Sequence, residues 1–318
     1  MTLNIQAAEL LKRAAESGTP GLGEGTPTEG RAIFAATTQL LGLPAPQVKE
    51  TQEVQISGPN GDIRTLVITP AGLETKNLPI FIYYHGGGWV IGSPETHYEE
   101  CCHYANEAQC IVVVPDYRLA PEHPFPAAPE DCYAVLQWAA DNAASLGADK
   151  SRIAVGGDSA GGNLSAVVAQ MTQQRSGPEL ALQLLIYPAT RMGAETQSYK
   201  DFDDGYFLTA KAMNWFFDHY LKQAEDWDNV LASPLLNDDL AGLAPAYVMT
   251  AGFDPLRDEG RAYADKLKAA GVPVEYVCYE GQIHGFASMA GALDEARSFL
   301  DEAVSVLRKA FKSQGIHS

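Results

Sequence analysis

A serine between two glycines stands where it could act as a nucleophile. Gly157, Ser159 and Gly161 form a Gly-x-Ser-x-Gly motif. The apolar run 152–156 before it predicts a buried strand, and residues 160–170 after it predict a helix. A tight turn between them would bring backbone segments too close for side chains, which explains the glycines. A strand that turns into a helix at such a serine favours a catalytic nucleophile over an ordinary glycine-rich turn with a solvated serine.

A serine hydroxyl needs a base to take its proton, and that base needs a group to orient it. Where the serine lies on such a turn, the partners follow along the chain in the order Ser, Asp/Glu, His. His284 follows the last predicted strand, 274–279, and a loop at the carboxyl end of a strand would aim it at the serine. His219 falls in an insertion, and His317 is the penultimate residue, a position that is usually poorly ordered. His284 is therefore the predicted base.

The orienting acid is predicted to be Asp254, which follows the predicted strand 247–250. Its carboxylate would accept a hydrogen bond from the histidine Nδ1–H, which fixes the tautomer and stabilises the imidazolium. Asp258 and Glu259 are the competing acids. They fall in the first turn of the next predicted helix, where acidic residues ordinarily interact with the helix dipole.

Three consecutive glycines follow the predicted strand 80–84, in a His-Gly-Gly-Gly-Trp segment that ends at Trp89. Glycines weaken strands and helices, so their use here indicates that backbone N–H groups approach something closely. We expect the N–H groups of Gly86 and Gly87, with that of Ala160 after the serine, to form an oxyanion hole. The alternative is a phosphate-binding loop, but neither of the glycine patterns of such loops occurs in the chain.

The elements that would position these groups alternate along the chain from about residue 48. Alternating strands and helices indicate an α/β fold with a mostly parallel sheet and helices on both faces. The first two strands flank a Pro-Asn-Gly-Asp turn and predict an antiparallel hairpin. The predicted strands are 54–56, 64–68, 80–84, 111–115, 153–156, 182–187, 247–250 and 274–279, and the helices lie near 95–108, 129–144, 160–174, 259–270 and 292–311.

Two regions lie outside this alternation. Helical patterns at 5–15 and 31–41 precede it, and an aromatic-rich stretch that contains a predicted helix, 209–221, interrupts it. This helix could simply pack on the body of the protein, or it could form a lid with the N-terminal helices. We favour the lid, because binding residues concentrate on insertions that a rigid scaffold carries.

Taken together, the motifs resemble those of the hormone-sensitive lipase family of α/β-hydrolases, the bacterial family IV carboxylesterases. They occur in the family's order and span nearly the whole chain from about residue 48. The matching segments are His85-Gly86-Gly87-Gly88-Trp89, the Asp-Tyr-Arg-Leu-Ala-Pro-Glu run 116–122, Gly157-Asp158-Ser159-Ala160-Gly161-Gly162-Asn163, the Asp-Pro-Leu-Arg-Asp-Glu-Gly run 254–260 and His284-Gly285-Phe286.

The resemblance implies an α/β-hydrolase fold with an eight-stranded sheet and a helical cap. The cap would consist of the N-terminal segment 1–47 together with 191–227, on a catalytic domain of residues 48–318. The implied activity is that of a serine carboxylesterase acting on short- to medium-chain acyl esters, with no metal and no cofactor. A homodimer formed through the last strand or helix is also implied.

The resemblance selects the same nucleophile, acid and base as the residues themselves: Ser159, Asp254 and His284. A ligand-binding protein on the same scaffold would lack a working triad, so the intact set disfavours that class. An amidase or a lipase would use the same residues, and the scissile bond stays open.

Several side chains near the motifs could contact substrate or support the site, although each could equally be plain packing. Arg118 could form a charged network with Glu122 or Asp131 that fixes the loops under the serine. The candidate substrate contacts are Trp89 beside the glycines, Ile283 and Phe286 beside the histidine, and Phe34, Phe207, Trp215 and Phe216 in the cap.

The composition bounds the partners. The 318-residue chain has a net charge of −18, which argues against nucleic acid or an anionic membrane as a partner and leaves a small-molecule ester as the expected one. Its five cysteines are odd in number and show no Cys-x-x-Cys spacing, which indicates a reducing compartment. The N-terminus lacks a signal-peptide pattern, and no apolar run approaches the roughly 18 residues of a membrane span. We expect a cytoplasmic protein.

Overall fold

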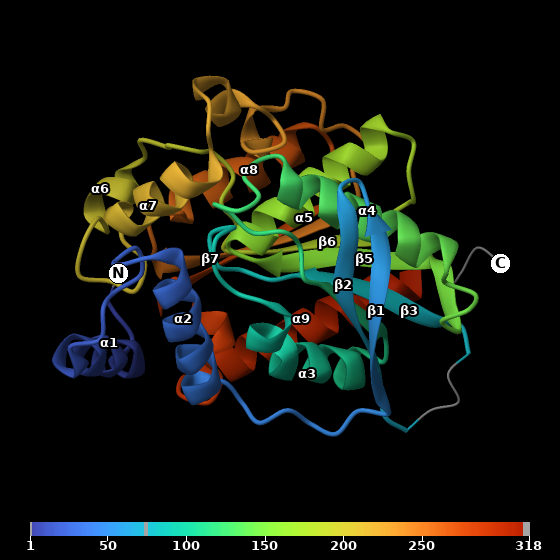
Figure 1. Cartoon of the computed structure of the whole chain (residues 1–318), viewed down its shortest axis with the longest axis horizontal. Helices are drawn as coiled ribbons and strands as arrows, with labels where there is room; N and C mark the ends of the chain where they lie inside the picture. The colour runs from blue at the N-terminus through green and yellow to red at the C-terminus, as the bar shows by residue number, and fades with distance from the viewer. Residues whose placement is uncertain (1, 73–75, 314–318) are drawn as a thin grey trace.

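The structure of the chain is a computed structural model that describes residues 2–72 and 76–313 (Figure 1). One sheet forms its centre, with the strand order β1-β2-β4-β3-β5-β6-β7-β8. The second strand is antiparallel to its two neighbours, and the other pairs are parallel, so the predicted mostly parallel eight-stranded sheet is confirmed. The strands are β1 (Glu50–Gly58), β2 (Gly61–Thr69), β3 (Leu78–Tyr84), β4 (Ile111–Pro115), β5 (Ala148–Asp158), β6 (Leu182–Ile186), β7 (Ala246–Phe253) and β8 (Val274–Ile283).

Helices cover both faces of the sheet, as the alternation predicted. α3 (Tyr98–Ala108) and α9 (Asp294–Ser313) pack on one face. α4 (Ala127–Asp141), α5 (Ala160–Gln174) and α8 (Arg257–Ala269) pack on the other. Figure 1 shows α4 and α5 above the sheet and α3 and α9 below it.

The central strands are apolar throughout because both of their faces are covered. Every residue of β3 is buried. Side chains alternate between the two faces of a strand, so Ile80 and Ile82 pack with α4 and α5 while Phe81 and Tyr83 pack with α3 and α9. Continuous apolar runs of this kind are typical of strands buried on both sides.

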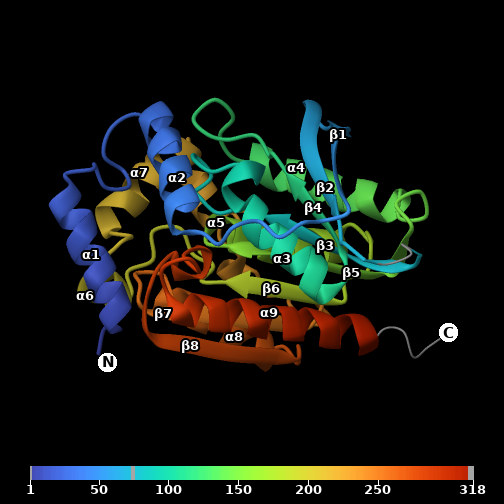
Figure 2. The same ribbon diagram turned by 90° about the horizontal axis from the view of Figure 1, so that it is seen from below.

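Four further helices gather at one end of the molecule, the left side in Figure 2. They are α1 (Ile5–Ser17), α2 (Pro27–Leu41), α6 (Gln197–Asp201) and α7 (Ala210–Tyr220). α2 begins at a capping box, in which Thr26 and Glu29 satisfy each other's free backbone N–H groups and Pro27 takes the first helical position. Among the described residues, no helix combines the length and the hydropathy needed to cross a membrane.

The predicted helix 95–108 is only partly α-helical in the structure. Its first part is a 3-10 turn, η1 (Pro94–His97), and the α-helix starts only at Tyr98. His97 leaves the helical backbone conformation, with φ −123° and ψ 11°, at the point where its ring lies against Asp158. The other 3-10 turns are η2 (Ala224–Asp228), η3 (Pro234–Leu236) and η4 (Phe286–Ser288).

The structure settles which acid pairs with Arg118. Its guanidinium binds the buried carboxylate of Asp131 through Nε at 2.8 Å and Nη2 at 2.6 Å, and its backbone N–H donates to the same carboxylate. Glu122 instead binds Arg31 of α2, with Nη2 and Oε2 2.6 Å apart. One pair thus fixes the segment after β4 to α4, and the other fixes α2 to that segment.

We expect Asp131→Asn to lower the free energy of unfolding by about 3 kcal/mol, because it leaves the Arg118 guanidinium without a counter-charge. Urea denaturation measures this change. The control is Glu9→Gln, which breaks the exposed Arg13–Glu9 pair and should cost less than about 1 kcal/mol. Equal effects for the two substitutions would contradict a stabilising role of the buried pair.

Candidate active site

Ser159 lies at a sharp turn between β5 and α5. Its backbone has φ 55° and ψ −115°, a conformation that residues with side chains rarely adopt. A Cβ on Gly157 or Gly161 would overlap the carbonyl oxygen of Tyr84 at the end of β3. The two glycines therefore let β3 approach the turn, and the Ile186 carbonyl accepts the Ser159 N–H at 2.8 Å. The surroundings hold the strained turn in place.

Three side chains from the ends of three strands meet at this turn. His284 Nε2 lies 2.9 Å from Ser159 Oγ, and His284 Nδ1 lies 2.7 Å from Asp254 Oδ2. Asp254 is fully buried, and its other oxygen accepts the Leu256 N–H at 2.8 Å. With Nδ1 donating to the carboxylate, Nε2 is free to accept the serine proton, which is the arrangement of a Ser-His-Asp triad.

The competing histidines and acids are elsewhere. His219 lies in α7 with its Nδ1 on the Trp215 carbonyl, and His317 lies outside the described residues. Asp258 binds Arg257 and the Ser198 N–H, and Glu259 accepts the N–H groups of Thr190 and Arg191. The structure thus brings together the three residues that chain order selected.

The glycine segment after β3 lies beside Ser159, but its first amide is already occupied. The Gly86 N–H donates to Asp158 Oδ1 at 2.8 Å, so the prediction that it faces the substrate is wrong. Among the described residues, no acceptor faces the N–H groups of Gly87, Gly88 and Ala160. Gly87 and Gly88 also line the cavity at Ser159. The sequence does not distinguish the N–H groups of three adjacent glycines. Asp158, the acid next to Ser159, was nevertheless a possible acceptor for one of them.

A partly open cavity adjoins Ser159. Its walls are mostly apolar and come from α2, α7, the glycine segment and the segment after β8. Of the predicted substrate contacts, Phe34, Trp89, Phe207 and Phe216 line it. Sequence reasoning missed several apolar lining residues, which nothing in the sequence separates from core residues: Leu22, Leu41, Ile91, Leu208, Met213 and Met289.

The other three predicted contacts do not line the cavity. Trp215 packs on Phe216 and His219. Ile283 and Phe286 are fully buried, and the Phe286 ring lies among aromatic rings from β8 and α9. These side chains belong to the packing behind the cavity wall.

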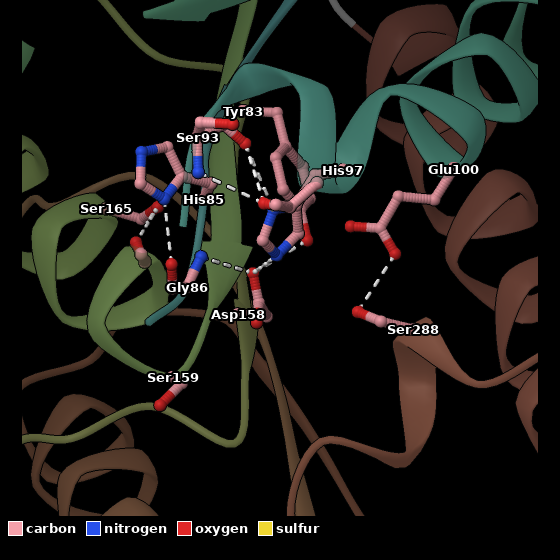
Figure 3. Close-up of polar contacts among 12 residues, drawn as sticks. Tyr83, His85, Gly86, Ser93, His97, Glu100, Asp158, Ser159, Ser165 and Ser288 are labelled. Atoms are coloured by element: carbon pink, nitrogen blue, oxygen red, sulfur yellow. Dashed lines mark hydrogen bonds and ion pairs between the residues drawn. The ribbon is translucent and has the colours of Figure 1, made fainter. Parts of the chain in front are cut away.

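A second group of titratable side chains lies beside Gly86 (Figure 3). Asp158 Oδ1 is 3.3 Å from His97 Nε2 and accepts the Tyr83 hydroxyl at 3.0 Å. His97, Glu100 and Asp158 each offer one atom that could ligate a metal, and these three atoms lie within 4.8 Å of one another. Because N–H and O–H donors already occupy the Asp158 oxygen, the arrangement fits a buried ion pair better than a metal site.

Burial and charge act in opposite directions on this group. Burial lowers the pKa of His97, but the Asp158 carboxylate and the hydrogen bond to it outweigh burial and raise that pKa to about 9. Burial raises the pKa of Glu100 to about 7, against the charge of His97. Burial also acts to raise the pKa of Asp158, yet His97 and Tyr83 hold it below its usual value. At neutral pH the pair is therefore an imidazolium and a carboxylate.

Comparison with known proteins identifies the family of the chain. A family model described as the α/β-hydrolase fold matches residues 81–288. The carboxylic ester hydrolase LipN of Mycobacterium tuberculosis is 42% identical over 273 residues, 84% of this chain and 72% of that protein. The carboxylesterase NlhH of the same species is 40% identical over 291 residues, covering 90% of this chain and 91% of that one.

Solved structures are equally similar. An ester hydrolase from the metagenome of Lake Arreo has a TM-score of 0.94 and 44% identity, with 98% of this chain and 100% of that chain covered. The hyperthermophilic esterase of Pyrobaculum calidifontis has a TM-score of 0.92 and 39% identity, with 97% and 99% covered. The chain belongs to the α/β-hydrolase family, and the resemblance to its hormone-sensitive lipase branch is confirmed.

We expect Glu100→Gln to flatten the dependence of stability on pH. The pKa of Glu100 is about 7 in the folded protein, above its ordinary value of 4.5. The contribution of Glu100 to the free energy of unfolding is therefore complete below pH 4.5 and is lost as the pH rises through about 7. Urea denaturation at pH 5 and pH 8 should show a smaller loss in the variant, by about 1 to 3 kcal/mol. An unchanged difference between the two pH values would contradict the raised pKa.

Proposed function

We propose that this protein is a serine carboxylesterase that hydrolyses short- to medium-chain acyl esters through an acyl-enzyme intermediate. The observation that carries the proposal is the continuous line of hydrogen bonds from Asp254 through His284 to Ser159, at the base of an apolar cavity. The names of the relatives, carboxylic ester hydrolase, carboxylesterase and ethyl acetate hydrolase, support an ester as the scissile group.

Acylation uses the three triad residues in turn. His284 Nε2 takes the proton of Ser159 while Oγ forms a bond to the ester carbonyl carbon. Asp254 keeps Nδ1–H in place and stabilises the imidazolium. The negative charge on the carbonyl oxygen is bound by N–H groups in place before reaction, for which we assign Gly87, Gly88 and Ala160. The imidazolium then protonates the alcohol oxygen as the ester C–O bond breaks.

Deacylation repeats the same proton transfers with water as the nucleophile. His284 takes a proton from water as the water oxygen attacks the acyl carbon, and the same N–H groups bind the oxyanion. The imidazolium returns the proton to Ser159 Oγ as the acyl C–O bond breaks. The carboxylic acid leaves, and the enzyme returns to its starting state.

We assign α1, α2, α6 and α7 to a cap, formed by residues 1–47 and 191–227, over a catalytic domain of residues 48–318. Two observations support this division. α2 and α7 both contribute walls to the cavity at Ser159. Arg31 of α2 also donates from Nε to the Val90 carbonyl at 2.9 Å and from Nη2 to the Ala120 carbonyl at 3.0 Å. The cap is thus attached to the loops beside the glycine segment.

We also place the enzyme in the cytoplasm and infer a homodimer. All five cysteines are unpaired, and four of them are buried, which suits a reducing compartment. Within the described residues β8 pairs only with β7, so its outer edge could pair with the same edge of a second copy.

Ser159→Ala should lower turnover of p-nitrophenyl butyrate by at least about 10,000-fold, because the substitution removes the only group that forms the acyl-enzyme. Circular dichroism should show an unchanged fold. A fluorophosphonate should label the wild type and not the variant. Ser151→Ala, on the same strand, is the matched control and should keep wild-type turnover. Turnover or labelling retained in Ser159→Ala would refute the proposal.

A series of p-nitrophenyl esters from acetate to palmitate tests the acyl preference. We expect kcat/KM to peak at butyrate or hexanoate and to fall at least about tenfold by palmitate. The reason is that longer chains extend beyond the apolar walls of the cavity at Ser159, so that the added methylene groups remain in water. Activity confined to long, aggregated substrates would instead identify a lipase.

A further inference from the structure

The carboxylate of Asp158 connects the two parts of the candidate active site. Asp158 is the last residue of β5 and the neighbour of Ser159, so its backbone belongs to the nucleophile turn. Its Oδ1 accepts the Gly86 N–H at 2.8 Å, and Gly86 is the first residue of the glycine segment. Figure 3 shows the contact from the Gly86 nitrogen to the Asp158 carboxylate, with Ser159 below both. One side chain thus fixes the distance between the nucleophile and the segment that faces it.

The contact leaves little freedom to the glycine segment. A Cβ on Gly86 would overlap the Asp158 carboxylate, so the close approach requires glycine at this position. Beyond Gly86, the Gly87 carbonyl accepts the N–H groups of Val90 and Ile91 at 3.1 and 2.9 Å. Each of the next two amides shares a planar peptide group with a hydrogen-bonded carbonyl, that of Gly86, 2.7 Å from His85 Nδ1, or that of Gly87. The Asp158 contact is the anchor at the N-terminal end of the segment, so its loss would shift the segment, and both amides with it, relative to Ser159.

A buried carboxylate needs a counter-charge, and His97 supplies it. Asp158 is 5% exposed and His97 is 1% exposed. His97 Nε2 is 3.3 Å from Asp158 Oδ1, and His97 Nδ1 is 2.8 Å from Thr96 Oγ1. The Thr96 hydroxyl donates its own proton to the Ser93 carbonyl, so it accepts from Nδ1. Nδ1 therefore donates to Thr96, and Nε2 lies within ion-pair distance of the carboxylate, which is the arrangement expected of an imidazolium.

Neutral groups and one further acid complete the surroundings. The Tyr83 hydroxyl donates to the carboxylate oxygen that binds Gly86. The His85 ring stacks on His97 with centroids 5.7 Å apart, and burial lowers the pKa of His85 to about 3, so it adds no charge. Glu100 hydrogen-bonds Ser288 at 3.2 Å. Among these groups, the His97 imidazolium is the cation that faces Asp158.

We propose that Asp158 and His97 form a positioning pair for the oxyanion hole: the carboxylate holds the Gly86 N–H so that the next two amides face the substrate, and the imidazolium keeps that carboxylate ionised. This inference rests on the proposed esterase function. Neither residue donates a proton to the substrate or forms a bond with it. The pair acts through Gly86, and its effect falls on the transition state, where the oxyanion forms.

Four variants test the pair. Asp158→Ala removes every acceptor for the Gly86 N–H. Asp158→Asn keeps the shape and a carbonyl oxygen for that N–H but removes the charge. His97→Gln removes the counter-charge, and the double variant Asp158→Asn/His97→Gln replaces the ion pair by neutral hydrogen-bonding groups. The last three keep side chains of similar size, so the test does not depend on the folding of Asp158→Ala.

The expected result is a loss in kcat without a comparable change in KM. Loss of one oxyanion-hole donor typically lowers kcat by about 100- to 1000-fold, so Asp158→Ala should lose about 100-fold with KM within about threefold. Asp158→Asn and His97→Gln should each lose about tenfold. Because they remove the same ion pair, the double variant should also lose about tenfold rather than about 100-fold.

A transition-state analogue separates positioning from a merely structural role. A trifluoromethyl ketone forms a hemiketal with Ser159 whose oxygen occupies the oxyanion hole. Its inhibition constant should rise in each variant by the same factor as the fall in kcat/KM. Assays are run well below each variant's melting temperature. Asp149→Asn, at the opposite end of β5, is the control and should keep wild-type kcat and inhibition.

Three results would overturn the inference. They are wild-type kcat in Asp158→Ala, a raised KM with kcat retained, and losses from Asp158→Asn and His97→Gln that multiply in the double variant. Wild-type kcat in Asp158→Ala would show that the carboxylate does not position the oxyanion hole. A raised KM with kcat retained would indicate that the side chain contacts the substrate directly. Multiplying losses would show that Asp158 and His97 act independently. A wild-type protein without hydrolysis or fluorophosphonate labelling would instead refute the esterase proposal itself.

Discussion

Two backbone segments meet beneath Ser159, and little else in the site could form without that contact. The carbonyl of Tyr84, at the end of β3, lies against Gly157 and Gly161, where no side chain fits. Adjacent parallel strands place this carbonyl there, because β3 and β5 are hydrogen-bonded neighbours in the sheet. The strained φ of Ser159 is thus maintained by the sheet, and the serine hydroxyl projects toward His284.

The nucleophile is supported from two sides by the same pair of residue types. On one side, His284 and Asp254 share a hydrogen bond of 2.7 Å, and the outer ring nitrogen faces the serine. On the other side, His97 Nε2 lies 3.3 Å from Asp158 Oδ1, and His97 Nδ1 faces the hydroxyl of Thr96. The chemistry of an imidazole beside a buried carboxylate is similar in both places. The partner of the second ring nitrogen differs between the two pairs: it is the nucleophilic serine in the first pair and a structural threonine in the second. We therefore assign proton transfer to the first pair and positioning of the backbone to the second.

The sequence predicted the parts of this protein that depend on local pattern and chain order. Strand-helix alternation predicted the sheet, and the order along the chain selected Ser159, Asp254 and His284. Which of three adjacent glycine amides faces the substrate depends on rotation about the backbone, which a run of identical residues does not encode. Trp215 likewise belongs to an amphipathic helix, and only the packing of α7 decides which of its aromatic residues reaches the cavity. The role of His97 arises from a contact between distant segments that no local pattern signals.

The attachment of α2 to the body of the protein links substrate entry to catalysis. A single guanidinium, that of Arg31, binds the carbonyl of Val90, and Val90 donates its own N–H to Gly87. α2, whose residues line the cavity, is thereby joined to the peptide group that carries the Gly88 N–H. One arginine thus links the wall that would contact the acyl chain to an amide that we assign to the oxyanion, so the fit of a substrate against α2 and the geometry of its reaction are not independent.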